Sequence, residues 1–77
     1  MAGARRISEC KEFRVNGGRT AAGEFVRVTH VPSKRSRQQA VARGTTSRIL
    51  ADLLARQIAE ELRAEGVELS AELAGLV

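Results

Sequence analysis

Five basic residues stand within fifteen positions in the middle of this chain, and no acidic residue stands among them. Cations held this close repel one another, and an anionic partner would relieve the repulsion. Arginine and lysine donate charge-assisted hydrogen bonds to phosphate oxygens, so nucleic acid is the first partner that we expect. The cluster consists of Lys34, Arg35, Arg37, Arg43 and Arg48.

Catalytic and metal-binding chemistry is not expected. The chain has one histidine, His30, and one cysteine, Cys10, and two ligands are too few for a structural zinc site. The spacing shows no Cys–His or Ser–His–Asp arrangement, and carboxylates pair only on the solvated face of a helix. We predict that the protein is not an enzyme and uses no metal, cofactor or small-molecule substrate.

Charge is distributed unevenly along the sequence. Residues 1–48 carry a net charge of +8 and residues 49–77 carry −4. One half could therefore dock on a polyanion, or the two halves could complement each other within a dimer. Trp and Tyr are absent and both phenylalanines are expected in the core, so we do not expect base stacking. These features favour contact with a duplex through its backbone.

The length of 77 residues predicts one domain with a small core. No apolar run approaches the roughly 20 residues of a membrane span, no secretory leader is evident, and a lone cysteine forms no internal disulfide. We expect a cytoplasmic protein without a membrane partner. Residues 1–9 are expected to be a mobile basic arm, and residues 10–77 a single domain.

The segment Thr45–Ala64 is predicted to be a long amphipathic helix. Apolar residues recur every four positions in two adjacent rows, which is helical spacing. Thr45 or Thr46 can cap its start and Gly66 can end it in a left-handed conformation. With the best strand of the chain, the two rows give the expected core, which consists of Ile49, Leu50, Leu53, Leu54, Ile58, Val26 and Val28.

Two strands are predicted before the helix. Lys11–Val15 alternates apolar and polar residues and runs into Asn16-Gly17, a pair that suits a tight turn. The segment Asn16–Gly23 is poor in strand-forming residues, so we expect a loop. Glu24–Val31 is rich in β-branched residues and forms the second strand, which Pro32 ends.

Gln38–Arg43 can be read as a third strand or as a short helix. The strand is preferred because a helix would bury only Ala40, Val41 and Ala42. As a helix the segment has helix-turn-helix spacing, or it resembles ribbon-helix-helix proteins, in which Arg27 and Thr29 of paired strands would read base edges. As a strand, the three strands and the helix that starts at GTTSR resemble the second half of a double-stranded-RNA-binding domain.

The fold class predicted is therefore α+β, with a small antiparallel sheet of two or three strands, one long helix and a short C-terminal helical turn capped by Ser70. The apolar arc of the helix exceeds what a short sheet covers. The tail should fold back on the row of Ile49 and Leu53, or it should pair with a second copy. The predicted homodimer interface consists of Ile49, Leu53, Leu73 and Leu76.

Two functions fit this sequence. The first is a nucleic-acid-binding module that contacts phosphates through the basic loop and the helix N-terminus, with Arg27 added to the five clustered cations. The second is a small module of the kind that phages and mobile elements encode, which binds a larger protein complex. In size and lack of motifs the chain resembles anti-CRISPR inhibitors. A salt titration of duplex binding separates the two functions.

Overall fold

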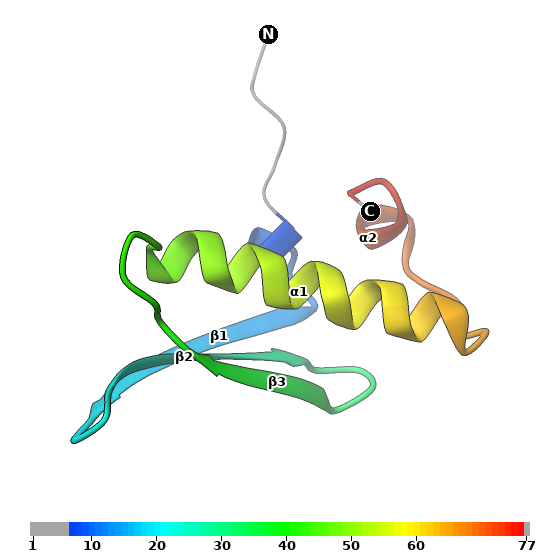
Figure 1. The fold of residues 1–77 in the computed structure, drawn as a ribbon. Helices are drawn as coiled ribbons and strands as arrows, with labels where there is room; N and C mark the ends of the chain where they lie inside the picture. The colour runs from blue at the N-terminus through cyan, green and yellow to red at the C-terminus, as the bar shows by residue number, and fades with distance from the viewer. Residues whose placement is uncertain (1–6, 77) are drawn as a thin grey trace, which may run out of the picture.

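The computed structural model describes residues 7–76 (Figure 1). A three-stranded antiparallel sheet, with strand order β1-β2-β3, is covered on one face by one long helix, which confirms the predicted α+β class. Two short helical segments lie on the same side of the sheet as the long helix (Figure 1). The elements are η1 (Ile7–Glu9), β1 (Phe13–Thr20), β2 (Gly23–His30), β3 (Arg35–Ala40), α1 (Ser47–Ala64) and α2 (Ala71–Ala74).

Strands β1 and β2 form a hairpin over eight residue pairs, so the predicted loop over Asn16–Gly23 is wrong. The turn lies at the end of that segment, where the Thr20 hydroxyl accepts from the N–H of Ala22 and donates to the carbonyl of Gly23, both at 3.2 Å. Asn16-Gly17 instead pairs in mid-strand. Cross-strand contacts, above all with the ring of Phe25, outweigh the weak intrinsic strand preference of this segment.

The third strand is confirmed, although it starts at Arg35, three residues earlier than predicted. It follows a tight turn in which Lys34 has a φ of 62° and donates its N–H to the carbonyl of Val31 at 3.3 Å. The strand excludes the helix-turn-helix and ribbon-helix-helix arrangements, because both place a helix at Gln38–Arg43. The arrangement of three strands followed by a helix is the one observed.

Helix α1 begins and ends as its sequence predicts. The Thr46 hydroxyl accepts from the N–H of Ile49 at 3.2 Å, and Gly66, with a φ of 83°, follows the last turn. Five of the seven predicted core residues are buried. Ile49 and Leu53 are not, since they remain 58% and 46% exposed. The buried residues among those predicted are Leu50, Leu54, Ile58, Val26 and Val28.

The tail packs against the chain's own core and leaves Ile49 and Leu53 uncovered. Leu73 is fully buried and Leu76 packs against the same core, so these two predicted interface residues already have intramolecular partners. The buried face of α1 extends through Ala51, Ala55 and Ala59. Alanines leave room for neighbouring segments to approach a helix closely, and η1 and α2 contribute to the same core.

The expected mobile arm covers residues 1–9, of which residues 1–6 lie outside the described part of the chain. The expectation is wrong for the last three residues, because Ile7–Glu9 form a turn of 3-10 helix. Ile7 is buried in the core, and Ser8 donates to the Asp52 carboxylate from its N–H at 3.0 Å and from its hydroxyl at 2.6 Å. Burial and hydrogen bonding therefore fix this segment on α1.

Candidate nucleic-acid interface

The two basic residues of β3 that point toward the helix are paired within the molecule. Arg35 donates from both Nη atoms to the two carboxylate oxygens of Glu65, each at 2.6 Å, and its Nη1 lies 3.3 Å from Glu61 Oε1. Arg37 forms a second ion pair with the other carboxylate oxygen of Glu61. The Arg35 guanidinium lowers the pKa of the Glu65 carboxyl, mainly through these hydrogen bonds. Both arginines are thus neutralised by the acidic end of α1.

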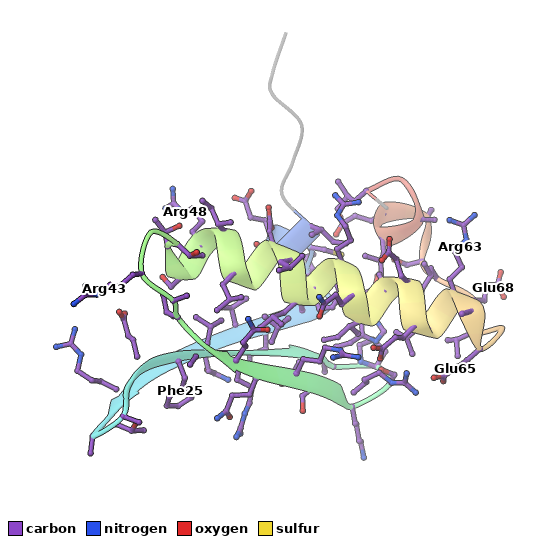
Figure 2. All side chains as sticks on the ribbon, viewed as in Figure 1. Phe25, Arg43, Arg48, Arg63, Glu65 and Glu68 are labelled. Carbon is purple, nitrogen blue, oxygen red and sulfur yellow. The ribbon has the colours of Figure 1, made fainter. Side chains whose placement is uncertain are left out.

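The structure therefore divides the predicted five-residue cluster. Lys34 lies in the turn before β3, beside residues of the sheet's other face. Arg43 and Arg48 lie at the end of the molecule where α1 begins (Figure 2). Among residues 7–76, none of these three cations forms an ion pair. Three of the five predicted contacts are available to an external anion.

Within residues 7–76, the strands place no acidic residue on the face of the sheet that turns away from α1. Residues directly opposite one another in antiparallel strands share a face, and the buried Val26 and Val28 mark the inner one. The acidic residue of β2, Glu24, is two residues from Val26 and therefore lies on the inner face as well. We call the other side the outer face, and its three cross-strand rows are Arg14–Thr29–Ser36, Asn16–Arg27–Gln38 and Gly18–Phe25–Ala40.

Three cations gather around an open depression of about 390 Å³ on this outer face. Arg14 and Arg27 are diagonal neighbours on adjacent strands, and Lys34 approaches from the turn before β3. Arg27 is held in place because its Nε and Nη2 donate to Gln38 Oε1 at 3.0 and 2.7 Å. The remaining N–H groups of Arg27 stay available to a phosphate. Asn16, Thr29 and Val31 complete the lining.

Sequence reasoning found Arg27 and Lys34 but missed Arg14. The signal was present, since Arg14 alternates with the apolar Phe13 and Val15. To assign Arg14 to the site, however, one must know the pairing of β1 with β2. This pairing places Arg14 opposite Thr29 and on the same face as Arg27. Without the register of β1 and β2, no periodicity joins residues from different strands.

Phe25 corrects a second expectation, that both phenylalanines lie in the core. Phe13 is buried and packs against His30, with ring centroids 5.3 Å apart. Phe25 instead lies on the outer face and points away from α1 (Figure 2). Its side chain is only partly buried. One aromatic ring is therefore placed on the same face as the three cations.

Another depression, of about 460 Å³, lies between β1 and the start of α1. Its lining includes both Arg48 and Glu9, so cations do not dominate it as they dominate the outer face. Val15, Val26 and Ala51 supply its apolar surface. This mixture of charges does not select for an anion, and we take the outer face as the better candidate site.

A polar cluster around one buried histidine lies on the inner side of the sheet. His30 is 4% exposed, with its Nδ1 2.8 Å from the Ser33 hydroxyl and its Nε2 3.0 Å from Glu12 Oε1. The other oxygen of Glu12 accepts from the Ser70 hydroxyl. Hydrogen bonds from Ser70 and His30 lower the pKa of the Glu12 carboxyl. Neither His30 nor Ser33 lines the depressions described above, so we interpret the cluster as a clamp that joins the residue before β1, the turn after β2 and the tail.

Metal ligands do not converge in the described chain, where no three His, Cys, Asp or Glu side chains form a group that could hold an ion. Burial raises the pKa of the Cys10 thiol, so it is protonated at neutral pH and is a poor nucleophile. No helix between residues 7 and 76 is long and apolar enough to cross a membrane. No protein-family model, curated protein sequence or solved structure matches this chain.

Proposed function

We propose that this domain binds nucleic acid through the outer face of its sheet. The observation that carries the proposal is the difference between the two faces of the sheet: the arginines that face α1 are paired with glutamates, and the cations of the outer face are not paired within residues 7–76. Arg35 and Arg37 are matched by Glu61 and Glu65, whereas Arg14, Arg27 and Lys34 have no acidic neighbour on their face. A surface of one sign attracts a polyanion and orients it.

Phosphate contacts supply most of the affinity in this proposal. Arg27 presents its remaining N–H groups from a fixed position, and Lys34 and Arg14 act as mobile charges beside it. Arg43 and Arg48 are further exposed cations at the end where α1 begins, outside the outer face (Figure 2). Contacts of this kind position a strand and read no sequence, so we expect weak sequence preference.

A salt titration of binding to random-sequence DNA, in duplex and single-stranded form, tests the proposal. The logarithm of the association constant should fall linearly with the logarithm of salt concentration. Arg14→Gln and Lys34→Gln should each weaken binding on all sequences and reduce the slope by about one unit. Arg63→Gln is the matched control, because Arg63 is an exposed cation on α1, far from the outer face in sequence and layer (Figure 2). An equal loss with Arg63→Gln would show that net charge alone attracts the nucleic acid.

A second candidate function is binding to a larger protein, as for small inhibitors encoded by mobile elements. The exposure of Ile49 and Leu53 favours it, since the two side chains lie one turn apart on α1. The same titration distinguishes the two functions. A protein-interaction module would bind random DNA weakly, and changes at Arg14 and Lys34 would leave that residual binding unaltered.

A further inference from the structure

Phe25 is an aromatic residue on a face where the pattern of the strand calls for polar side chains. It stands opposite Gly18 on one side and Ala40 on the other. Its ring leans across β1, since a Cβ atom on Gly18 would lie 2.7 and 2.8 Å from the ring atoms Cε1 and Cζ. Glycine and alanine, the two smallest residue types, therefore flank the ring, and neither side chain is large enough to cover it.

Part of this arrangement is structural. An aromatic ring that covers a glycine on the next strand compensates for the missing side chain and stabilises the pair. A leucine or isoleucine at position 25 would also cover Gly18. The structural role accounts for the ring surface that contacts β1, and Phe25, which is only partly buried, keeps part of its surface open to solvent.

The surroundings of the ring suit a planar, polar-edged ligand. A depression of about 250 Å³ lies beside Phe25, which is several times the roughly 30 Å³ that one water molecule occupies in the liquid. Gln38 lines it, and since Gln38 Oε1 already accepts from Arg27, its amide N–H groups remain free to donate. The other lining residues are Thr20, Ala22, Gly23 and Ala40, together with Glu24 and Gln39, which have the parity of the inner face.

The ring of Phe25 and the nearest cation of the outer face, Arg27, are separated by one repeat of the strand, which is two residues. Phe25 and Arg27 are two residues apart on β2, so their side chains leave the same face about 7 Å apart. Arg14 lies diagonally beyond Arg27. A strand whose phosphates contact these two arginines would bring a base next to Phe25.

We infer that Phe25 is a stacking platform for an unpaired nucleobase, so that single-stranded nucleic acid is the preferred partner of the outer face. The inference rests on the proposed function and adds the class of nucleic acid to it. Bases in a duplex are stacked on one another and hide their faces, whereas those of a single strand stack readily on aromatic side chains. The sequence favoured a duplex because both phenylalanines were expected in the core. Since Phe25 lies on the outer face, we now favour a single strand.

Fluorescence offers a direct test because the chain contains no Trp and no Tyr. Phe25→Trp places a single reporter at the proposed platform. Four probes of about 10 nucleotides are compared, namely single-stranded DNA, single-stranded RNA, duplex DNA and an abasic single strand. The DNA and RNA single strands that carry bases should quench the tryptophan fluorescence. The duplex and the abasic strand should not quench it, even when they are bound. Leu53→Trp, on the exposed side of α1, is the control and should not respond to any probe.

Phe25→Leu is the second variant, because it keeps an apolar cover over Gly18 and removes the aromatic ring. It should weaken binding of the DNA or RNA single strand about 5- to 150-fold and leave binding of the abasic strand unchanged. The more affected of the two strands identifies the sugar that the site prefers. Circular dichroism confirms that the variant is folded.

The outcomes separate the inference from the function on which it rests. If Arg14→Gln weakens binding while Phe25→Leu and the Phe25→Trp reporter show no response to bases, phosphate binding stands and stacking is refuted. If Phe25→Leu weakens binding of the abasic strand as much as that of the normal strand, the ring acts only through the fold and stacking is again refuted. If none of the four probes binds, both the function and the platform are refuted.

Discussion

Arg35 on β3 holds both carboxylate oxygens of Glu65, which lies directly after the last residue of α1. This two-point contact, together with the pairing of Arg37 and Glu61, fixes the end of the helix over the third strand. The uneven charge of the sequence thus has an internal explanation. Part of the positive half and part of the negative half meet within one chain, which removes two arginines from the surface that an external anion could contact.

The first prediction concerns this pair. Arg35→Gln should lower the urea midpoint of unfolding, because it leaves Glu65 without its hydrogen-bond donor. The same change in a Glu65→Gln background should have a much smaller effect, as a double-mutant cycle would show. High salt should reduce the coupling, since both groups are close to solvent. Lys34→Gln is the control, and it should leave the midpoint unchanged while weakening nucleic-acid binding.

The second prediction concerns the two apolar rows of α1. Leu54 is fully buried and its neighbour Leu53 is exposed. Leu54→Ala should therefore destabilise the fold by about 2–5 kcal/mol, because it removes buried methyl groups and leaves a cavity. Leu53→Ala should change the stability by less than about 1 kcal/mol. Urea unfolding of both variants checks the difference. A cost below about 1 kcal/mol for Leu54→Ala would mean that the buried face is wrongly assigned.

These two leucines also show how far the sequence predicts the fold. The caps at Thr46 and Ser70 and the spacing of α1 are local features, so they were predictable. The choice of buried face was not, because it depends on where η1 and α2 pack. Alanine carries little hydrophobic signal, yet Ala55 and Ala59 are fully buried.

The candidate site was predictable only in part, for a similar reason. Residues that are close together in the sequence need not lie on the same surface. Along β3, successive side chains point to opposite faces of the sheet. Arg35 and Arg37 therefore face the helix, while Gln38 faces outward beside Arg27. The outer face combines residues from three strands, and only the hairpin register reveals which of them meet.

The third prediction concerns the partly exposed clamp at Glu12. Its carboxyl pKa is lowered below the ordinary 4.5 on folding, chiefly by the hydrogen bond from Ser70 and also by His30. A lowered carboxyl pKa stabilises the fold above the unfolded value, and this stability is lost as the pH falls through the folded value. Glu12→Gln should therefore destabilise the protein at neutral pH by about 1–3 kcal/mol, and the deficit should shrink below about pH 4.5.

Urea unfolding of wild type and variant between about pH 6 and pH 3 measures this change. Glu68→Gln serves as control, because Glu68 is exposed and forms no ion pair within residues 7–76 (Figure 2). It should show no pH-dependent difference from the wild type. If the deficit of Glu12→Gln is the same at every pH, the clamp does not depend on the ionised carboxylate.

The last prediction is self-association through Ile49 and Leu53. These side chains lie on neighbouring turns of one side of α1, and the tail that was expected to cover them packs elsewhere. In a two-fold dimer the same residues of both chains meet, so two exposed side chains become a four-residue apolar contact. Such a contact is much smaller than the standard interface, and we therefore expect a weak dimer.

Sedimentation over a range of micromolar concentrations should show the average mass rising from one chain toward two. The double variant Ile49→Lys with Leu53→Lys should stay monomeric, because association would bury charges without partners. Val67→Lys is the matched control, since Val67 is also exposed but lies beyond the far end of α1. It should associate like the wild type. A wild-type mass of one chain throughout this range would refute the dimer and leave the exposed pair free for a different partner.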